Sequence, residues 1–82
     1  MRNNQQSSYA AAEFIINYKL FLLRLIGNTS NFINFSMPTV KGVSEEDLLK
    51  ILNSKFPSLK SVRFEYIDKP TANGTTIVYI EK

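Results

Sequence analysis

The feature that most constrains this chain is its apolar front segment, residues 9–26, which reads YAAAEFIINYKLFLLRLI. Residues 10–13 favour a helix, whereas residues 14–26 are rich in strand formers and long aliphatic side chains. As a strand, the segment would be apolar on both faces. As a helix, it would carry a stripe of four large side chains, Phe14, Tyr18, Phe21 and Leu25. Further leucines spread the apolar surface nearly all round that helix, so either conformation has to be covered on both sides, by the rest of the domain or by a second chain.

The residues that follow predict a hairpin. Residues 27–31 (GNTSN) are turn formers, and residues 32–37 (FINFSM) nearly alternate between apolar and polar side chains. Pro38 ends this strand because it lacks the N–H donor that would extend a ladder. We therefore expect the end of the front segment, from about Leu20, to pair as a first strand with residues 32–37.

The clearest element is a helix over residues 45–55. Ser44 is a favourable N-cap residue and Asp47 stands three positions later, which is the spacing of a capping box with Asp in the usual place of Glu. Val43 and Leu48 fit the hydrophobic contact that often flanks such a cap. The core-facing stripe of this helix is expected to comprise Leu48, Leu49, Leu52 and Phe56.

Two further strands are predicted toward the C-terminus, over residues 62–66 and 76–80, joined by a turn over residues 68–74. The predicted order is strand, strand, helix, strand, strand, with room for an additional N-terminal helix. This is an α+β fold with one main helix over a mostly antiparallel sheet. Residues 1–8 are polar and are expected to be a disordered tail, and residues 9–82 a single small domain.

That order is the ubiquitin-like β-grasp arrangement, and from about Leu20 to Ile80 the chain resembles the Phox-and-Bem interaction domains of that superfamily. The resemblance is carried by a basic first strand, a Phe-rich second strand ending in Met37-Pro38, and the helix phrase over residues 46–50. It continues through Phe56-Pro57 and the run over residues 62–68. The resemblance implies a module that binds other proteins.

Domains of that family associate front to back, and an acidic cluster after the third strand of one domain meets a basic residue on the first strand of the next. Here Asp68 is followed by Lys, Pro and Thr, so an acidic cluster is missing and the resemblance implies the basic-face type. Lys19 or Arg24 would then be the first-strand cation that binds an acidic partner. The competing interpretation is that such a cation only reaches water at the rim of the sheet.

Composition excludes several kinds of active site. The chain contains no cysteine and no histidine, which rules out disulfides, thiolate nucleophiles, histidine bases and the usual zinc ligands. Its acidic cluster, residues 45–47, is explained by the first turn of a helix, where negative side chains complement the dipole. We therefore expect a protein that is not an enzyme and uses no cofactor or metal. We also expect a cytoplasmic protein without a membrane span, because cysteine is absent and charges interrupt the front segment.

Three functions fit these features. The first is a protein-protein interaction or assembly module that binds an acidic partner surface or self-associates, which is the function we expect. The second is nucleic-acid binding on an aromatic and basic sheet face. Its residues would be Lys60, Arg63, Tyr66 and Tyr79. The third is a purely structural role in which the apolar front segment is a homo-oligomer or docking element, insensitive to salt.

Overall fold

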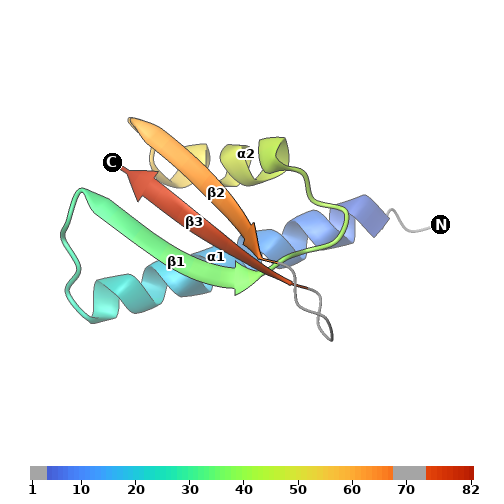
Figure 1. Ribbon diagram of the computed structural model, residues 1–82, viewed down its shortest axis with the longest axis horizontal. Helices are drawn as coiled ribbons and strands as arrows, with labels where there is room; N and C mark the ends of the chain where they lie inside the picture. Colours follow the sequence, from blue (N-terminus) through green and yellow to red (C-terminus); the bar gives the residue numbers. More distant parts are fainter. Residues whose placement is uncertain (1–3, 68–73) are drawn as a thin grey trace.

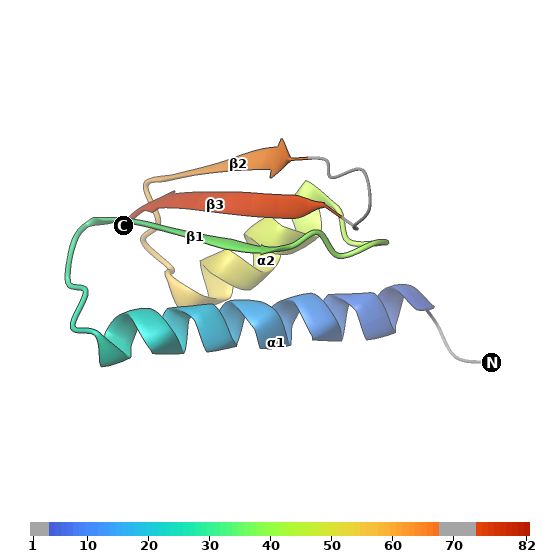
Figure 2. The same cartoon turned by 60° about the horizontal axis from the view of Figure 1, so that its bottom comes forward.

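The computed structural model describes residues 4–67 and 74–82, and it has two helices packed on one face of a three-stranded sheet (Figures 1 and 2). The elements in chain order are α1 (Asn4–Leu25), β1 (Phe32–Pro38), α2 (Glu45–Lys55), β2 (Ser61–Ile67) and β3 (Thr75–Glu81). The predicted α+β class is confirmed, and the three strands agree with the predicted ones to within a residue at each end. Of the turn expected over residues 68–74, all but Gly74 lies outside the described residues.

The sheet has the order β1-β3-β2, with the last strand in the centre. β3 is antiparallel to both neighbours, and the register places Phe35 and Phe64 on either side of Val78. β1 and β2 are therefore parallel to each other and are connected through α2. Because side chains alternate along a strand, every second residue of β1 and β3 is buried under the helices.

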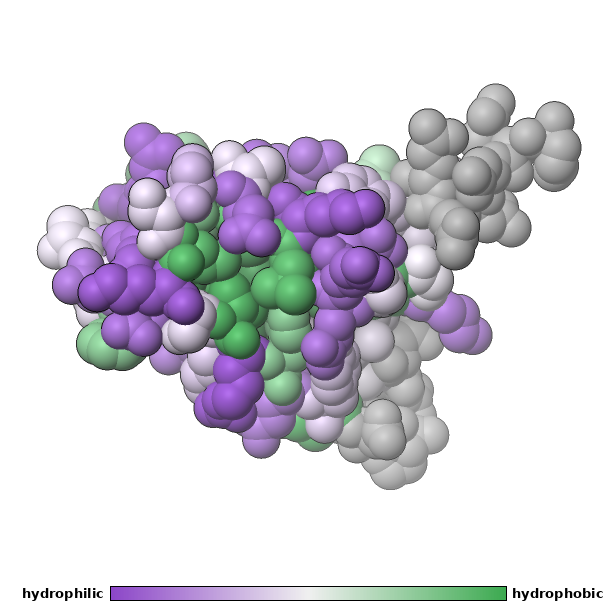
Figure 3. Space-filling view, turned by 90° about the horizontal axis from the view of Figure 1, so that it is seen from above, coloured by the Kyte–Doolittle hydropathy of each residue, from purple (hydrophilic) through white to green (hydrophobic). Residues whose placement is uncertain are grey.

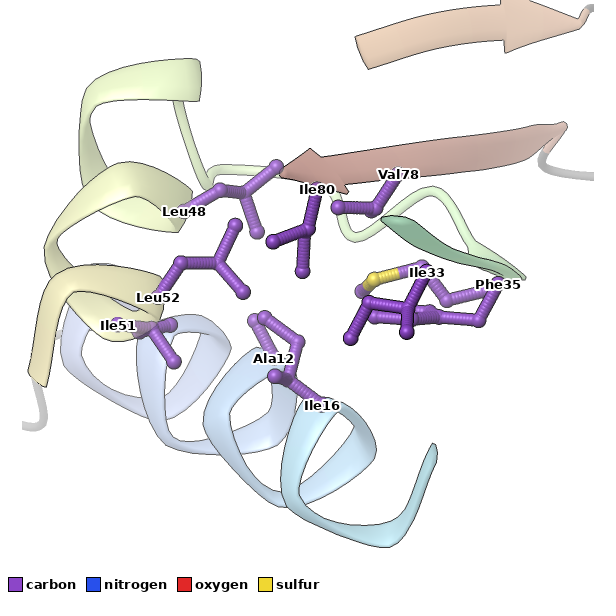
Figure 4. Packing of buried hydrophobic residues seen from close by; sticks show 10 residues of the cluster. Ala12, Ile16, Ile33, Phe35, Leu48, Ile51, Leu52, Val78 and Ile80 are labelled. Carbon is purple, nitrogen blue, oxygen red and sulfur yellow. The ribbon is translucent and has the colours of Figure 1, made fainter. Parts of the chain in front are cut away.

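The core is formed where the two helices meet the buried face of β1 and β3 (Figure 4). It comprises Ala12, Ile16, Ile33, Phe35, Met37, Leu48, Ile51, Leu52, Val78 and Ile80. Thr76 is the one buried polar residue among the described part of the chain, and its hydroxyl lies 2.8 Å from that of Thr39. β1 and β2 are both edge strands, but β2 has no buried residue, so the helices cover it only in part.

α2 has the predicted bounds and the predicted capping box. The Ser44 hydroxyl accepts a hydrogen bond from the Asp47 backbone N–H at 3.1 Å, and the Asp47 carboxylate accepts one from the Ser44 N–H at 3.2 Å. The predicted core stripe is partly wrong, because Ile51 is buried and Leu49 is only half-buried. The reason is that α2 packs against α1 as well as the sheet, which moves its buried side toward Ile51.

The prediction that the front segment ends in the first strand of a hairpin is wrong, because residues 4–25 form one continuous helix. The helix begins at Asn4, inside the segment expected to be a tail. It ends in a Schellman motif at Gly27 (φ 74°), where the Gly27 N–H donates to the Arg24 carbonyl and the Asn28 N–H to the Leu23 carbonyl, both at 3.0 Å. The order is therefore helix, strand, helix, strand, strand, and the β-grasp topology is not confirmed.

A physical reason favours the helix over the strand. A helix satisfies its backbone hydrogen bonds internally, whereas a strand over the same residues would need neighbouring strands. The helix also places Ala12 and Ile16 together on the side that faces the core, where both are completely buried.

Candidate interaction surface

α1 has two apolar sides that point in opposite directions. Successive residues of a helix are about 100° apart, so residues spaced by three or four positions share a side. The inner side faces α2 and the sheet; Ala12 and Ile16 are buried there, and Leu20 and Leu23 are partly buried. The opposite side carries four large residues at a spacing of four, three and four, which we call the outer stripe: Phe14, Tyr18, Phe21 and Leu25.

Each side chain of the outer stripe is more than half exposed. The exposed fractions are 72% for Phe14, 54% for Tyr18 and Phe21, and 66% for Leu25. Leu22 and Ile26 extend the exposed apolar surface along one flank of the stripe. Figure 2 shows why the stripe is uncovered, because α1 is the outermost layer and its far side faces away from the rest of the domain. One side of this helix therefore completes the core and the other is available for contact.

The other flank of the outer stripe is polar and carries Glu13, Asn17 and Arg24. Arg24 is exposed in the last turn of α1, where a cation complements the helix dipole. It borders an open depression of about 370 Å³ in which α1 meets the C-terminal end of α2. The lining residues are Asn17, Leu20, Phe21, Arg24, Lys55 and Phe56. Arg24 of α1 and Lys55 of α2 therefore border a depression that is lined partly by apolar side chains.

The two predicted partner-binding cations do not share a face. Lys19 and Arg24 both lie on α1 rather than on a strand, five positions apart, which is about 140° around the helix. Lys19 is half-buried and Arg24 is exposed. Arg24 instead lines the same depression as Lys55. No sequence pattern had linked these two residues, because the depression depends on how the two helices pack.

The outer face of the sheet carries a second polar and aromatic group. The Arg63 guanidinium stacks 4.0 Å from the centre of the Tyr79 ring, and the Tyr79 hydroxyl donates to the Glu65 carboxylate at 2.7 Å. That hydrogen bond is the main cause of a raised pKa of Tyr79. An open depression of about 360 Å³ lies beside this group, lined by residues from one end of all three strands.

Tyr66 and Lys60 do not join Arg63 and Tyr79 in one site. Side chains alternate between the two faces of a strand, and Tyr66 lies three positions after Arg63 in β2, so it points to the opposite face. This difference could have been deduced from the sequence. Burial, followed by the neighbouring Glu45 carboxylate, raises the pKa of Tyr66 to about 12. Lys60 is exposed just before β2, where its backbone N–H donates to the Glu81 carbonyl.

A second apolar area lies on the side of α2 and β2. Figure 3 shows apolar side chains there at the surface, between hydrophilic ones. Val62 and Phe64 point toward the helices but stay only partly buried, because the helices cover β2 only in part. This area belongs to the margin of the core rather than to a projecting surface like the outer stripe.

Comparison of the chain with protein-family models, curated proteins and solved structures finds no match. Within residues 4–67 and 74–82, no helix is both long enough and apolar enough to cross a membrane.

Proposed function

We propose that this protein is a non-enzymatic interaction module that binds another protein through the outer stripe of α1. The observation that carries the proposal is the set of four large apolar side chains, all more than half exposed, on the side of α1 opposite the core. The largest exposed apolar patch on a typical monomeric protein covers about 300–600 Å² and is often functional. Each aromatic ring presents about 150–250 Å² when fully accessible, so the three rings of the stripe expose roughly 350 Å².

The charge pattern of α1 supports a protein rather than a lipid surface as the partner. Helices that lie on membranes carry many Lys and Arg side chains on their polar face. α1 carries one acidic and two basic residues, Glu13, Lys19 and Arg24, and the two basic ones lie on different flanks. Arg24 with Lys55 adds a rim of positive charge beside the stripe, which favours an acidic group on the partner and orients its approach.

Nucleic-acid binding on the outer sheet face is a second candidate, favoured by the stacked pair of Arg63 and Tyr79. It is less well supported, because the ring and hydroxyl of Tyr79 are already engaged and two carboxylates, Glu65 and Glu81, share that face. Binding of a generic single-stranded oligonucleotide that weakens steeply as salt rises would support this second candidate.

Photo-crosslinking tests the proposal directly. A photoreactive phenylalanine analogue replaces Phe21 on the outer stripe or, as a control, Asn34, which is exposed on the outer sheet face. After irradiation in an extract of the native cells, we expect discrete protein adducts from position 21 and none from position 34. The adducts should disappear when Tyr18→Glu is added, because a charge would then enter the apolar contact. Absence of protein adducts from position 21, or adducts that persist with Tyr18→Glu, would refute the proposal.

A further inference from the structure

We propose that the partner on the outer stripe is a second copy of this chain, with the two α1 helices packed antiparallel about a two-fold axis. This inference rests on the proposed function, since it names the occupant of the same surface. The stripe spacing of four, three and four is that of a coiled-coil seam. Figure 2 shows that α1 lies along the outside of the domain, so two copies can approach through this side without their sheets meeting.

The spacing of the stripe is the same in both chain directions. An antiparallel second helix therefore places its Leu25 level with Phe14 and its Phe21 level with Tyr18. Each large residue then meets a large residue, as a self-complementary two-fold contact requires. A parallel arrangement would also align the stripe, so the apolar residues alone do not determine the direction.

The charged flank determines the direction. Glu13 and Arg24 lie on the same flank of the outer stripe, near opposite ends of it. A two-fold axis perpendicular to the helices keeps that flank on the same side in both copies. Arg24 of the second copy then lies within about 3 Å of Glu13 along the helix axis, and the pair occurs twice. Parallel helices related by a two-fold axis along their length would instead place the flank of Glu13 and Arg24 beside the apolar flank of the other copy, so neither charge would meet an opposite charge.

The available area agrees with a pair of helices. With two copies, the three aromatic rings of each stripe contribute about 700 Å². Leu22, Leu25 and Ile26 bring the contact to roughly 1,000 Å², which is the lower limit for a specific interface. The interface is small for an obligate dimer, so we expect an equilibrium between monomer and dimer rather than a permanent assembly.

Disulfide trapping tests the direction, since the chain has no cysteine and any introduced one is unique. Phe14→Cys and Leu25→Cys variants are oxidised separately and as a mixture. A disulfide needs Cα atoms closer than about 7 Å, and in the antiparallel pair position 14 faces position 25 of the other copy. Two copies of position 14 are then about 16 Å apart along the axis. We therefore expect the mixed disulfide to form quickly and the variants alone to cross-link slowly; fast cross-linking of Phe14→Cys with itself would overturn the antiparallel arrangement.

Charge exchange tests the pairing without any covalent bond. Glu13→Arg and Arg24→Glu each convert two attractive pairs into two repulsive ones, and the double variant restores attraction with the signs exchanged. Sedimentation equilibrium of the purified chain should show each single variant dimerising roughly tenfold more weakly, and the double variant returning to within about threefold of the original. Lys41→Glu, which changes an exposed charge in the loop between β1 and α2, outside the outer stripe and its flanks, is the matched control. Equal dimerisation of all four variants would refute the Glu13–Arg24 pairing.

The two proposals fail in different ways. A chain that stays monomeric up to millimolar concentration overturns the second-copy inference, but adducts of position 21 with a different protein would still support the interaction module. A lack of any protein adduct overturns both. A self-adduct of twice the monomer mass, with the mixed disulfide, supports both.

Discussion

The two sides of α1 predict opposite effects of mutation, and Ile16→Ala compared with Phe14→Ala is the sharpest test. Ile16 of α1 is completely buried in the core against α2 and the sheet (Figure 4). Phe14, two positions earlier, is 72% exposed. Both substitutions place Ala on the same helix, so differences in helix propensity are small compared with the difference in burial.

The magnitude for Ile16→Ala follows from its burial. Truncating a buried Ile to Ala removes apolar contact and leaves a cavity, which together cost about 2–5 kcal/mol. Because Ile16 has no exposed surface, we expect Ile16→Ala to lower the free energy of unfolding by about 3–4 kcal/mol. A domain of 82 residues has a total stability of about 4–12 kcal/mol, so this single change removes a large part of it. Phe14→Ala removes a ring that is mostly in water, and the free energy of unfolding should change by less than about 0.5 kcal/mol.

Urea unfolding followed by circular dichroism measures both values. The protein concentration must be low enough for the monomer to dominate, because a dimer would add stability to the original chain and not to Phe14→Ala. We expect a lower midpoint for Ile16→Ala with an unchanged slope, and a midpoint for Phe14→Ala close to the original. Similar losses for the two variants would show that the sides of α1 have been assigned incorrectly.

Two further predictions concern α2 and its contact with β2. Ser44→Ala should lower the free energy of unfolding by about 1 kcal/mol, because it removes the hydroxyl that accepts a hydrogen bond from the Asp47 N–H. Ser58→Ala, at an exposed site, should leave it unchanged. Equal unfolding midpoints of the two variants in urea would contradict this prediction. The pKa of Tyr66 is raised to about 12, so the folded chain holds this proton more tightly than the unfolded chain, in which the pKa is about 10. The stabilising contribution of Tyr66 is therefore complete below about pH 10 and lost as the pH rises toward 12. In urea titrations at alkaline pH, Tyr66→Phe should lose less stability than the original chain over this range. An unchanged pH dependence would contradict the raised pKa of Tyr66.

The parts of the fold that were predictable from sequence are those whose signals are local. The α2 helix was predicted because Ser44 and Asp47 form a reciprocal cap within four residues, and no distant contact is needed to define it. The three strands were predicted because alternation along residues such as Ile33, Phe35 and Met37 already separates a buried face from an exposed one.

The candidate site was only partly predictable. The sequence showed the outer stripe only under the helical alternative for the front segment. Gly27, which ends α1, was a signal for that helix, but it was interpreted only as part of a turn. The partner-binding role of Lys19 and Arg24 stays a prediction, but the structure separates the two around the helix and places Arg24 at the depression that Lys55 also lines.

By itself, the sequence determined the short amphipathic helix, the strands, the lack of histidine and cysteine chemistry, and the need to cover the front segment on two sides. Only the tertiary structure decided that residues 4–25 are helical, which side of that helix completes the core, and which side stays exposed. The physical reason is that a segment apolar nearly all round has no local preference for one face. Packing of Ala12 and Ile16 against α2 and the sheet selects that face, and the outer stripe is what remains for a partner.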